Sequence, residues 1–164
     1  MIDPHLGSKG WKLVIDSDLL FFKRPHLLID WSAQPRAPLH AIDVHTSYGY
    51  SGTLLSKLAG QSLEKKVNVG LCGLKSDDFN WDKLKYRCAE LITREKTNYY
   101  LEQALVAMLV AGQSCSIAPA NDYVTLPQLP EALECGAVMH HYVAESKRWY
   151  VQRDWRRFTD VPSS

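Results

Sequence analysis

The sequence predicts an α/β domain in which a mixed sheet is flanked by helices. Short apolar segments rich in β-branched residues recur along the chain, and amphipathic segments with helical spacing separate them. The second half alternates less regularly, which favours strands of mixed direction. The chain has 164 residues, enough for one domain. We expect 1–164 to form it, with 1–10 as an irregular lead-in and 159–164 as a loose tail.

Composition excludes several classes of protein. The apolar fraction of 46% is ordinary for a globular chain, and the formal net charge of +1 gives no electrostatic reason to expect a nucleic-acid partner. The longest apolar run, 104–112, is too short to span a bilayer. Residues 1–10 lack the apolar region of a signal peptide, so a cytoplasmic location is expected. The cysteines form no CxxC pair, which favours small buried side chains over a zinc site.

The strand predictions follow from apolar runs and from alternation. The mostly apolar segment 11–15 indicates a strand buried on both faces, and 39–44 alternates as a half-buried strand does. Segment 67–74 is interrupted by Asn68, Gly70 and Gly73. Glycine weakens a strand unless a backbone or ligand approaches closely, so this segment is either a bulged strand or the wall of a ligand pocket. Further strands are expected at 115–118, 123–126 and 137–143.

Helices are predicted where apolar residues recur at helical spacing. The expected helices are 25–33, 51–60, 82–96, 99–111 and a basic, tryptophan-rich segment at 146–158. Pro25 suits a first helical turn, and Ser51 suits an N-cap. Trp149 and Trp155 are expected to pack on the core, and the prolines at 127 and 130 indicate a loop.

Asp16 and Asp18 stand one residue apart between two apolar runs. A buried charge costs several kcal/mol unless it is paired or holds a metal. The pair therefore indicates either a divalent-metal site at the carboxyl end of a strand, where active sites of open sheets lie, or a simple turn.

Three later segments carry further candidate groups. Glu102 and Gln103 open a predicted helix, where an acidic residue also interacts favourably with the helix dipole. His141 lies towards the end of the last predicted strand, as a metal ligand or as one of a structural histidine pair. His140 should point to the opposite face and is the weaker candidate ligand.

In this order the motifs resemble those of the GT-A glycosyltransferases, especially glycogenin-like retaining enzymes and their bacterial galactosyltransferase relatives. Asp16-Ser17-Asp18 matches their Asp-x-Asp, after which the resemblance implies an apolar helix entry. Asn68-Val69-Gly70 matches Asn-x-Gly, and Glu102-Gln103 matches an acidic-Gln pair. His141, Lys147 and Trp149 match His-x-x-Gly-x-x-Lys-Pro-Trp, with Ala144 and Arg148 replacing the glycine and the proline.

The resemblance implies the C-terminal part of a GT-A fold without its N-terminal nucleotide-binding half. It implies metal-dependent transfer of a hexosyl group from a nucleotide-diphosphate sugar, a UDP-sugar above all, to an unknown acceptor. Mn²⁺ or Mg²⁺ would be held by Asp16, Asp18 and His141. The other implied roles are donor ribose for Asp16, diphosphate for Lys147, sugar or acceptor for Asn68 and Gly70, sugar hydroxyls for Glu102, and the anomeric carbon for Gln103.

Alternatives remain open at this level. The chain is either a fragment of a full transferase or a small relic, in which case it is a non-catalytic binding or scaffold domain that keeps the metal site. A metal-dependent phosphodiesterase or hydrolase built on Asp16, Asp18 and His141 is a third possibility, although such enzymes usually have more ligands. Without the missing half, strand 11–15 has an exposed edge, so a homodimer or other homo-oligomer that covers it is expected.

Overall fold

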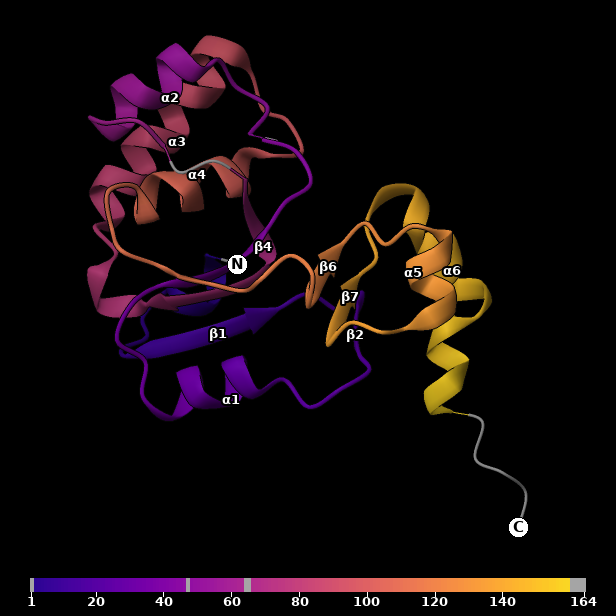
Figure 1. The fold of residues 1–164 in the computed structure, drawn as a ribbon. Coiled ribbons are helices and arrows are strands. Elements are labelled where there is room, and N and C mark those ends of the chain that lie inside the picture. Colours follow the sequence, from indigo (N-terminus) through magenta and orange to yellow (C-terminus); the bar gives the residue numbers. More distant parts are fainter. Residues whose placement is uncertain (1, 47, 64–65, 160–164) are drawn as a thin grey trace.

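The computed structural model describes residues 2–46, 48–63 and 66–159, and it contains two mixed sheets with flanking helices (Figure 1). The strands of the first sheet are, in spatial order, β1 (Trp11–Ile15), β4 (Val67–Lys75), β3 (Leu39–Ile42) and β5 (Ser116–Ile117). The strands of the second sheet are β2 (Leu19–Phe21), β7 (Met139–His141) and β6 (Tyr123–Thr125). The predicted fold class is therefore confirmed, with the strands divided between two sheets.

The strand directions in the first sheet bring three segments together at one end of the sheet: the residues after β1, the residues after β3 and the start of β4. Strands β1 and β3 both run antiparallel to β4, so they run in the same direction as each other. Ile15 at the end of β1 lies opposite Leu71, and Ile42 at the end of β3 lies opposite Val67. The residues that follow β1 and β3 consequently lie beside the first residues of β4.

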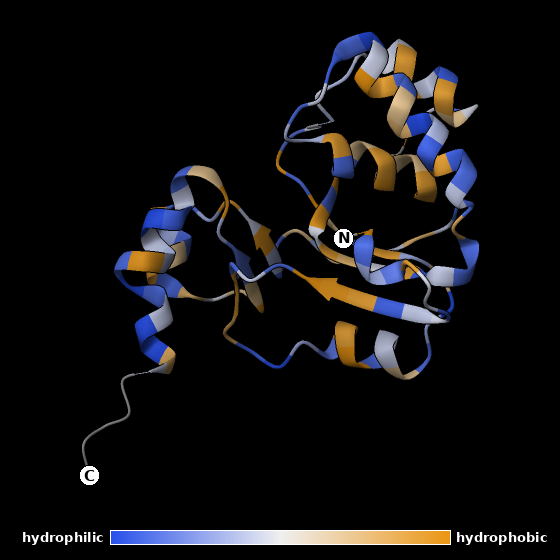
Figure 2. Ribbon diagram, turned by 180° about the vertical axis from the view of Figure 1, so that it is seen from behind, coloured by the Kyte–Doolittle hydropathy of each residue, from blue (hydrophilic) through white to orange (hydrophobic). Residues whose placement is uncertain are grey.

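Helices cover both faces of the first sheet. Leu71 and Gly73 of β4 face α1 (His26–Ala33), and a Cβ atom on Gly73 would lie 2.5 Å from the ring of Trp31. The alternate residues Cys72 and Leu74 pack in the second core, which contains α4 (Leu101–Val110). In Figure 2 the ribbon of α4 is mostly hydrophobic in colour, as expected for a helix enclosed between a sheet and other helices.

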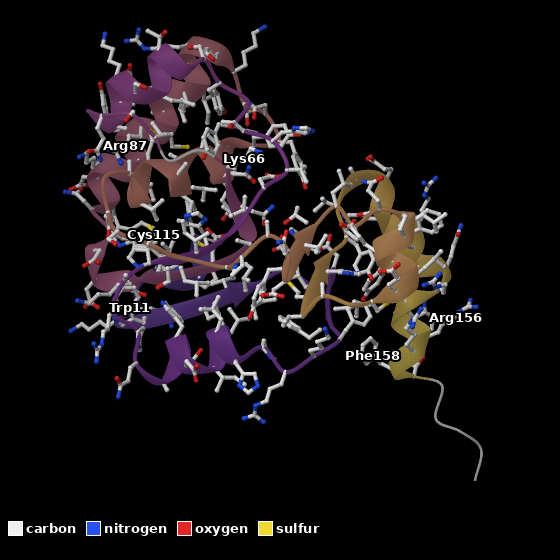
Figure 3. All side chains as sticks on the ribbon, viewed as in Figure 1. Trp11, Lys66, Arg87, Cys115, Arg156 and Phe158 are labelled. Carbon is white, nitrogen blue, oxygen red and sulfur yellow. The ribbon has the colours of Figure 1, made fainter. Side chains whose placement is uncertain are left out.

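Two further helices, α2 (Gly52–Ala59) and α3 (Trp81–Glu95), cover the outer side of α4. The buried guanidinium of Arg87, labelled in Figure 3, donates hydrogen bonds to the backbone carbonyls of Leu58, Ala59 and Met108. One side chain of α3 therefore links the ends of α2 and α4, and burial lowers the pKa of this guanidinium. Side-chain caps mark the starts of α2 and α3, where Ser51 and Asn80 accept hydrogen bonds from backbone N–H groups of the first turn.

The second sheet carries the C-terminal helices α5 (Leu129–Glu134) and α6 (Lys147–Gln152) and a 3₁₀ helix, Asp154–Phe158. The carboxylate of Asp154 is fully buried and accepts a hydrogen bond of 2.7 Å from the Tyr142 hydroxyl. Arg153 and Arg157 pair with the same carboxylate at 3.1 and 3.7 Å. This network fixes the terminal helices on β7. Phe158 packs against Phe22 with ring centroids 5.8 Å apart, while Arg156 lies on the outer side of these helices (Figure 3).

Several local predictions were wrong. The residues after Asp18 form strand β2, because their backbone pairs with β7. Strand β1 is half-buried, and its Ile15 is 41% exposed because β1 lies at the edge of its sheet. A capping box between Gln128 and Glu131 starts α5 where a loop was expected. Trp155 is 37% exposed and does not lie in the core.

The structure describes the N-terminal segment from residue 2 and the C-terminal segment as far as residue 159. Residues 3–5 form a short 3₁₀ helix, and Nδ1 of His5 lies 2.9 Å from the Ser76 hydroxyl. Five of the six residues of the expected loose tail, 160–164, lie outside the described residues. No helix in the described part of the chain is both long and apolar enough to cross a membrane.

Candidate functional site

The chain crosses from the first sheet to the second between Asp16 and Asp18. The backbone N–H of Asp16 donates to the carbonyl of Gly70 over 2.8 Å, which extends the pairing of β1 with β4. The carbonyl of Asp18 accepts a bond of 2.9 Å from the N–H of Tyr142, just after β7. Each aspartate is therefore fixed by its backbone to a different sheet, and the two carboxylates lie at the seam between them.

His141 comes to the same place from β7. Its Nε2 lies 3.3 Å from Oδ1 of Asp18 and 3.8 Å from Oδ2 of Asp16. One ligand atom from each of the three residues falls within 4.8 Å of the others. Nζ of Lys147 lies 3.2 Å from the second oxygen of Asp18. The structure thus brings together the three predicted metal ligands and the predicted phosphate-binding lysine.

These three groups suit a divalent cation. Oδ1 of Asp18 and Nε2 of His141 are buried, and neither forms a hydrogen bond with a group in the described part of the chain. Burial lowers the pKa of His141, against the opposing effect of the two aspartates, and this favours the neutral imidazole that binds metals. Burial likewise raises the pKa of Asp16. Two carboxylate oxygens and an imidazole nitrogen form a donor set that Mn²⁺ accepts.

Gly70 is the residue of β4 that lets His141 approach. A Cβ atom at this position would lie 2.0 Å from Cε1 and 2.6 Å from Nδ1 of the imidazole. Any other residue would require the ring or the strand to move. The glycine break in this strand therefore reflects the close approach of a side chain from the second sheet.

Asn68 is buried at the start of β4, and its Oδ1 accepts a hydrogen bond of 2.9 Å from the N–H of Gly70. Next to it the register of β3 and β4 shifts between His40 and Ala41, so this part of the sheet is irregular. Segment 67–74 was interpreted either as a bulged strand or as the wall of a ligand pocket. The structure shows both features, because the irregular strand also lines a cavity.

Glu102 and Gln103 lie in the first turn of α4, beside the same cavity. The Gln103 side-chain amide donates to Oδ2 of Asp43 over 3.0 Å, and the carboxylate of Glu102 accepts the N–H of Ile2 over 2.8 Å. Asp43 follows β3 and was not among the predicted site residues. Its position after a strand parallel to β1 is the signal that could have indicated it, because parallel strands end at the same edge.

All eight predicted site residues line one cavity of about 710 Å³. It opens at the seam of the two sheets and is large enough for a sizeable polar ligand. The other lining residues are Asp43, Val44, His45, Val69, Tyr99, Tyr100, Leu126, Val143, Ala144 and Glu145.

Ala144 and Arg148 stand where the C-terminal motif has a glycine and a proline. Ala144 keeps the backbone conformation of a glycine, whereas Arg148 contacts the neighbouring tryptophan. Ala144 has a φ of 46°, in the left-handed region that favours glycine, so the backbone adopts a glycine-type conformation without glycine. The guanidinium of Arg148 lies 4.2 Å from the ring centroid of Trp149, which is half-buried and does not line the cavity.

His140 points away from the cluster. Its Nδ1 lies 3.2 Å from the Tyr142 hydroxyl, and its ring packs edge-on against Phe22. The prediction that the two histidines face opposite sides of β7 is confirmed.

Comparisons with known proteins add little to this geometry. No protein-family model matches the chain, and no curated protein matches it in sequence. Among solved structures, it is similar to the crystal structure of a glycosyltransferase involved in the glycosylation of the major capsid of PBCV-1. The identity is 13%, the match covers 92% of this chain and 68% of that chain, and the TM-score is 0.47. Identity and TM-score are both low, so we base the functional proposal on the residues of the cavity.

Proposed function

We propose that the chain is a glycosyltransferase-like domain that binds a divalent cation and transfers a sugar from a nucleotide-diphosphate donor to an acceptor still to be identified. The observation that carries the proposal is the convergence of four separate motifs on one cavity. Asp16 and Asp18, Asn68-Val69-Gly70, Glu102-Gln103 and His141 with Lys147 come from distant parts of the sequence and all line it. Their order along the chain is the one that resembles the GT-A enzymes.

The ligand set supports Mn²⁺ in preference to Mg²⁺. Asp16, Asp18 and His141 would hold the cation, and an imidazole ligand suits Mn²⁺, whereas Mg²⁺ prefers oxygen ligands alone. When bound, the cation would supply the positive charge that stabilises a departing nucleoside diphosphate.

The remaining residues act on the donor and acceptor. Lys147 keeps 56% of its side chain exposed, so its ammonium group can move from Asp18 to a phosphate of the donor. Asn68 and Gly70 form the wall against which the sugar or acceptor lies. Glu102 would accept hydrogen bonds from sugar hydroxyls, and Gln103 would face the anomeric carbon, oriented by its bond to Asp43.

A second candidate is a non-catalytic binding or scaffold domain with the same metal site. The contacts of the two proposed catalytic residues favour it. In the described structure Glu102 is engaged by the backbone of Ile2, and Gln103 by Asp43. Catalysis would need at least the first contact to yield to substrate, whereas metal binding needs neither residue.

Calorimetry with Mn²⁺, followed by Mn²⁺ with UDP, tests the proposal. We expect Mn²⁺ binding to be lost in Asp18→Asn and His141→Gln, and retained in Asp30→Asn, a matched change on the exposed surface of α1. Absence of Mn²⁺ binding by the wild-type chain would refute the site. UDP binding without sugar transfer or donor hydrolysis would exclude the transferase and leave the non-catalytic domain.

A further inference from the structure

The outer edge of β1 has no strand beside it among the described residues. The hydrogen bonds from the Asp16 N–H to the Gly70 carbonyl and from the Ser76 N–H to the Gly10 carbonyl show which residues of β1 form hydrogen bonds with β4. In an antiparallel pair, hydrogen-bonded and non-hydrogen-bonded positions alternate. The N–H and C=O groups of Lys12 and Val14 therefore point towards β4, and those of residues 11, 13 and 15 point outwards.

Two of the usual devices that prevent strand addition, a bulge and a proline, are absent from this edge. Pairing of β1 with β4 continues without a register shift from Trp11 to Ile15, so no bulge bends the strand away, and the segment contains no proline. Ile15 is 41% exposed, and Trp11 lies at the other end of the strand (Figure 3). Lys12 is the one charged residue within the strand. A regular, partly apolar edge of this kind favours pairing with another strand.

The charges beside the edge are arranged so that the strand complements itself. Lys12 lies near the start of β1, and Asp16 directly follows its end; both belong to the same alternating set of side chains and therefore face the same side. A two-fold axis at Val14 would place Val14 opposite the partner's Val14, and Lys12 opposite the partner's Asp16. Oppositely charged residues directly across an antiparallel pair are stabilising.

Other registers match the charges less well. An axis at Lys12 places the two lysines opposite each other, which is destabilising, and an axis at Leu13 places each lysine opposite a valine. We propose that two copies of this chain pair antiparallel through β1, centred on Val14, so that the first sheet continues into the partner's. The outward N–H and C=O groups of Leu13 would form hydrogen bonds with those of the partner's Ile15, and the groups of Ile15 would bond in the same way to the partner's Leu13.

The pairing is independent of the proposed chemistry. It depends on the backbone of β1 and on Lys12 and Asp16, and it needs neither a metal nor a nucleotide. Nearly half of the Asp16 side chain, 47%, is exposed, so its carboxylate has room for a second charged neighbour besides His141. Failure of the metal site would leave the dimer unaffected, and a monomeric chain could still bind Mn²⁺.

Sedimentation equilibrium of the metal-free full chain gives the first test. We expect a monomer–dimer equilibrium, and about tenfold weaker association in Lys12→Glu, because two ion pairs become two repulsive pairs. Lys57→Glu makes the same charge change in α2, away from β1 (Figure 1), and should associate as the wild type does. A monomeric wild type across the micromolar range, or unchanged association of Lys12→Glu, would refute the proposal.

A disulfide test determines the register. Cys72 of β4 lies directly opposite Val14 and could form a disulfide within one chain, so the background must remove it as well. In a background where Cys72 is alanine and Cys88, Cys115 and Cys135 are serine, Val14→Cys should form a covalent dimer under mild oxidation. Non-hydrogen-bonded antiparallel pairs place Cα atoms about 4.5 Å apart, within the range for a disulfide. Leu13→Cys would face the partner's Ile15 and should stay monomeric on a non-reducing gel. A disulfide in Leu13→Cys but not in Val14→Cys would overturn the register.

Discussion

A Cβ atom on Gly70 would lie 2.0 Å from Cε1 of His141, so this glycine of β4 determines whether the imidazole of β7 can reach the two aspartates. The Asn-x-Gly and His-containing motifs are therefore two halves of one steric arrangement. The absence of a side chain at Gly70 leaves space beside the first sheet, and that space lets His141 of the second sheet lie next to the two aspartates.

Gly70→Ala should displace His141 and weaken Mn²⁺ binding about tenfold or more, the usual consequence of a misplaced ligand. Overpacking should also lower the free energy of unfolding by about 1–3 kcal/mol. Gly73→Ala, on the same strand, is the matched control, because its new methyl group meets the ring of Trp31 in α1 and not that of His141. It should lose comparable stability in urea and retain Mn²⁺ affinity in calorimetry. Equal Mn²⁺ affinities for all three proteins would contradict the steric account.

Lys147→Gln should separate stability from ligand binding. The lysine side chain is 56% exposed, so its ion pair with Asp18 is screened, and loss of the pair should change the free energy of unfolding by less than about 0.5 kcal/mol. Affinity for UDP in the presence of Mn²⁺ should fall about tenfold, since a charge-assisted contact to phosphate is lost. Arg148→Gln, one residue away, should leave UDP affinity unchanged. An equal loss in both variants would indicate a general charge effect.

Ala144→Gly should be tolerated or slightly stabilising, unlike most alanine-to-glycine changes. The backbone there has a φ of 46°, where a Cβ atom is strained, so glycine relieves strain while it adds freedom to the unfolded chain. Ala59→Gly, at the end of α2, is the control and should cost about 0.5–1 kcal/mol. Thermal or urea unfolding measures both. A loss for Ala144→Gly as large as the control's would show that the turn is unstrained.

Tyr142→Phe should destabilise the terminal helices. The hydroxyl donates to the fully buried carboxylate of Asp154, and its removal leaves that carboxylate one donor short, at a cost of about 1–3 kcal/mol. The exposed Tyr86→Phe should change the free energy of unfolding by less than about 0.5 kcal/mol. Urea unfolding followed by circular dichroism measures both. A near-neutral Tyr142→Phe would mean that Arg153 and Arg157 satisfy Asp154 without it.

Sequence reasoning predicted the elements whose periodicity is strong. Helices such as α3, with its apolar stripe, and strand β4, with its β-branched residues, have local signals that tertiary contacts reinforce. Asp16 and Asp18 could be selected because two carboxylates between apolar runs are unusual. Their proximity to His141 came from resemblance of motif order and not from any property of either segment.

The remaining errors have a common physical cause. Strand β2 spans only Leu19–Phe21, and its apolar residues fit a helix equally well, so pairing with β7 determines its conformation. Asp43 was missed because a single aspartate after a strand carries no spacing signal. Its importance arises only when the parallel directions of β1 and β3 bring it beside Gln103. Contacts between distant segments, which periodicity cannot show, determine both features.

The position of Asp16 and His141 on different sheets has a thermodynamic consequence. A cation bound by both residues would join the end of β1 to the end of β7, so its binding free energy would include a contribution from the relative orientation of the sheets. By linkage, a substitution that loosens the contact between the sheets lowers cation affinity, and the cation opposes separation of the sheets by the same free energy. In this chain the rigidity of the seam and the occupancy of the site would be two measures of one equilibrium.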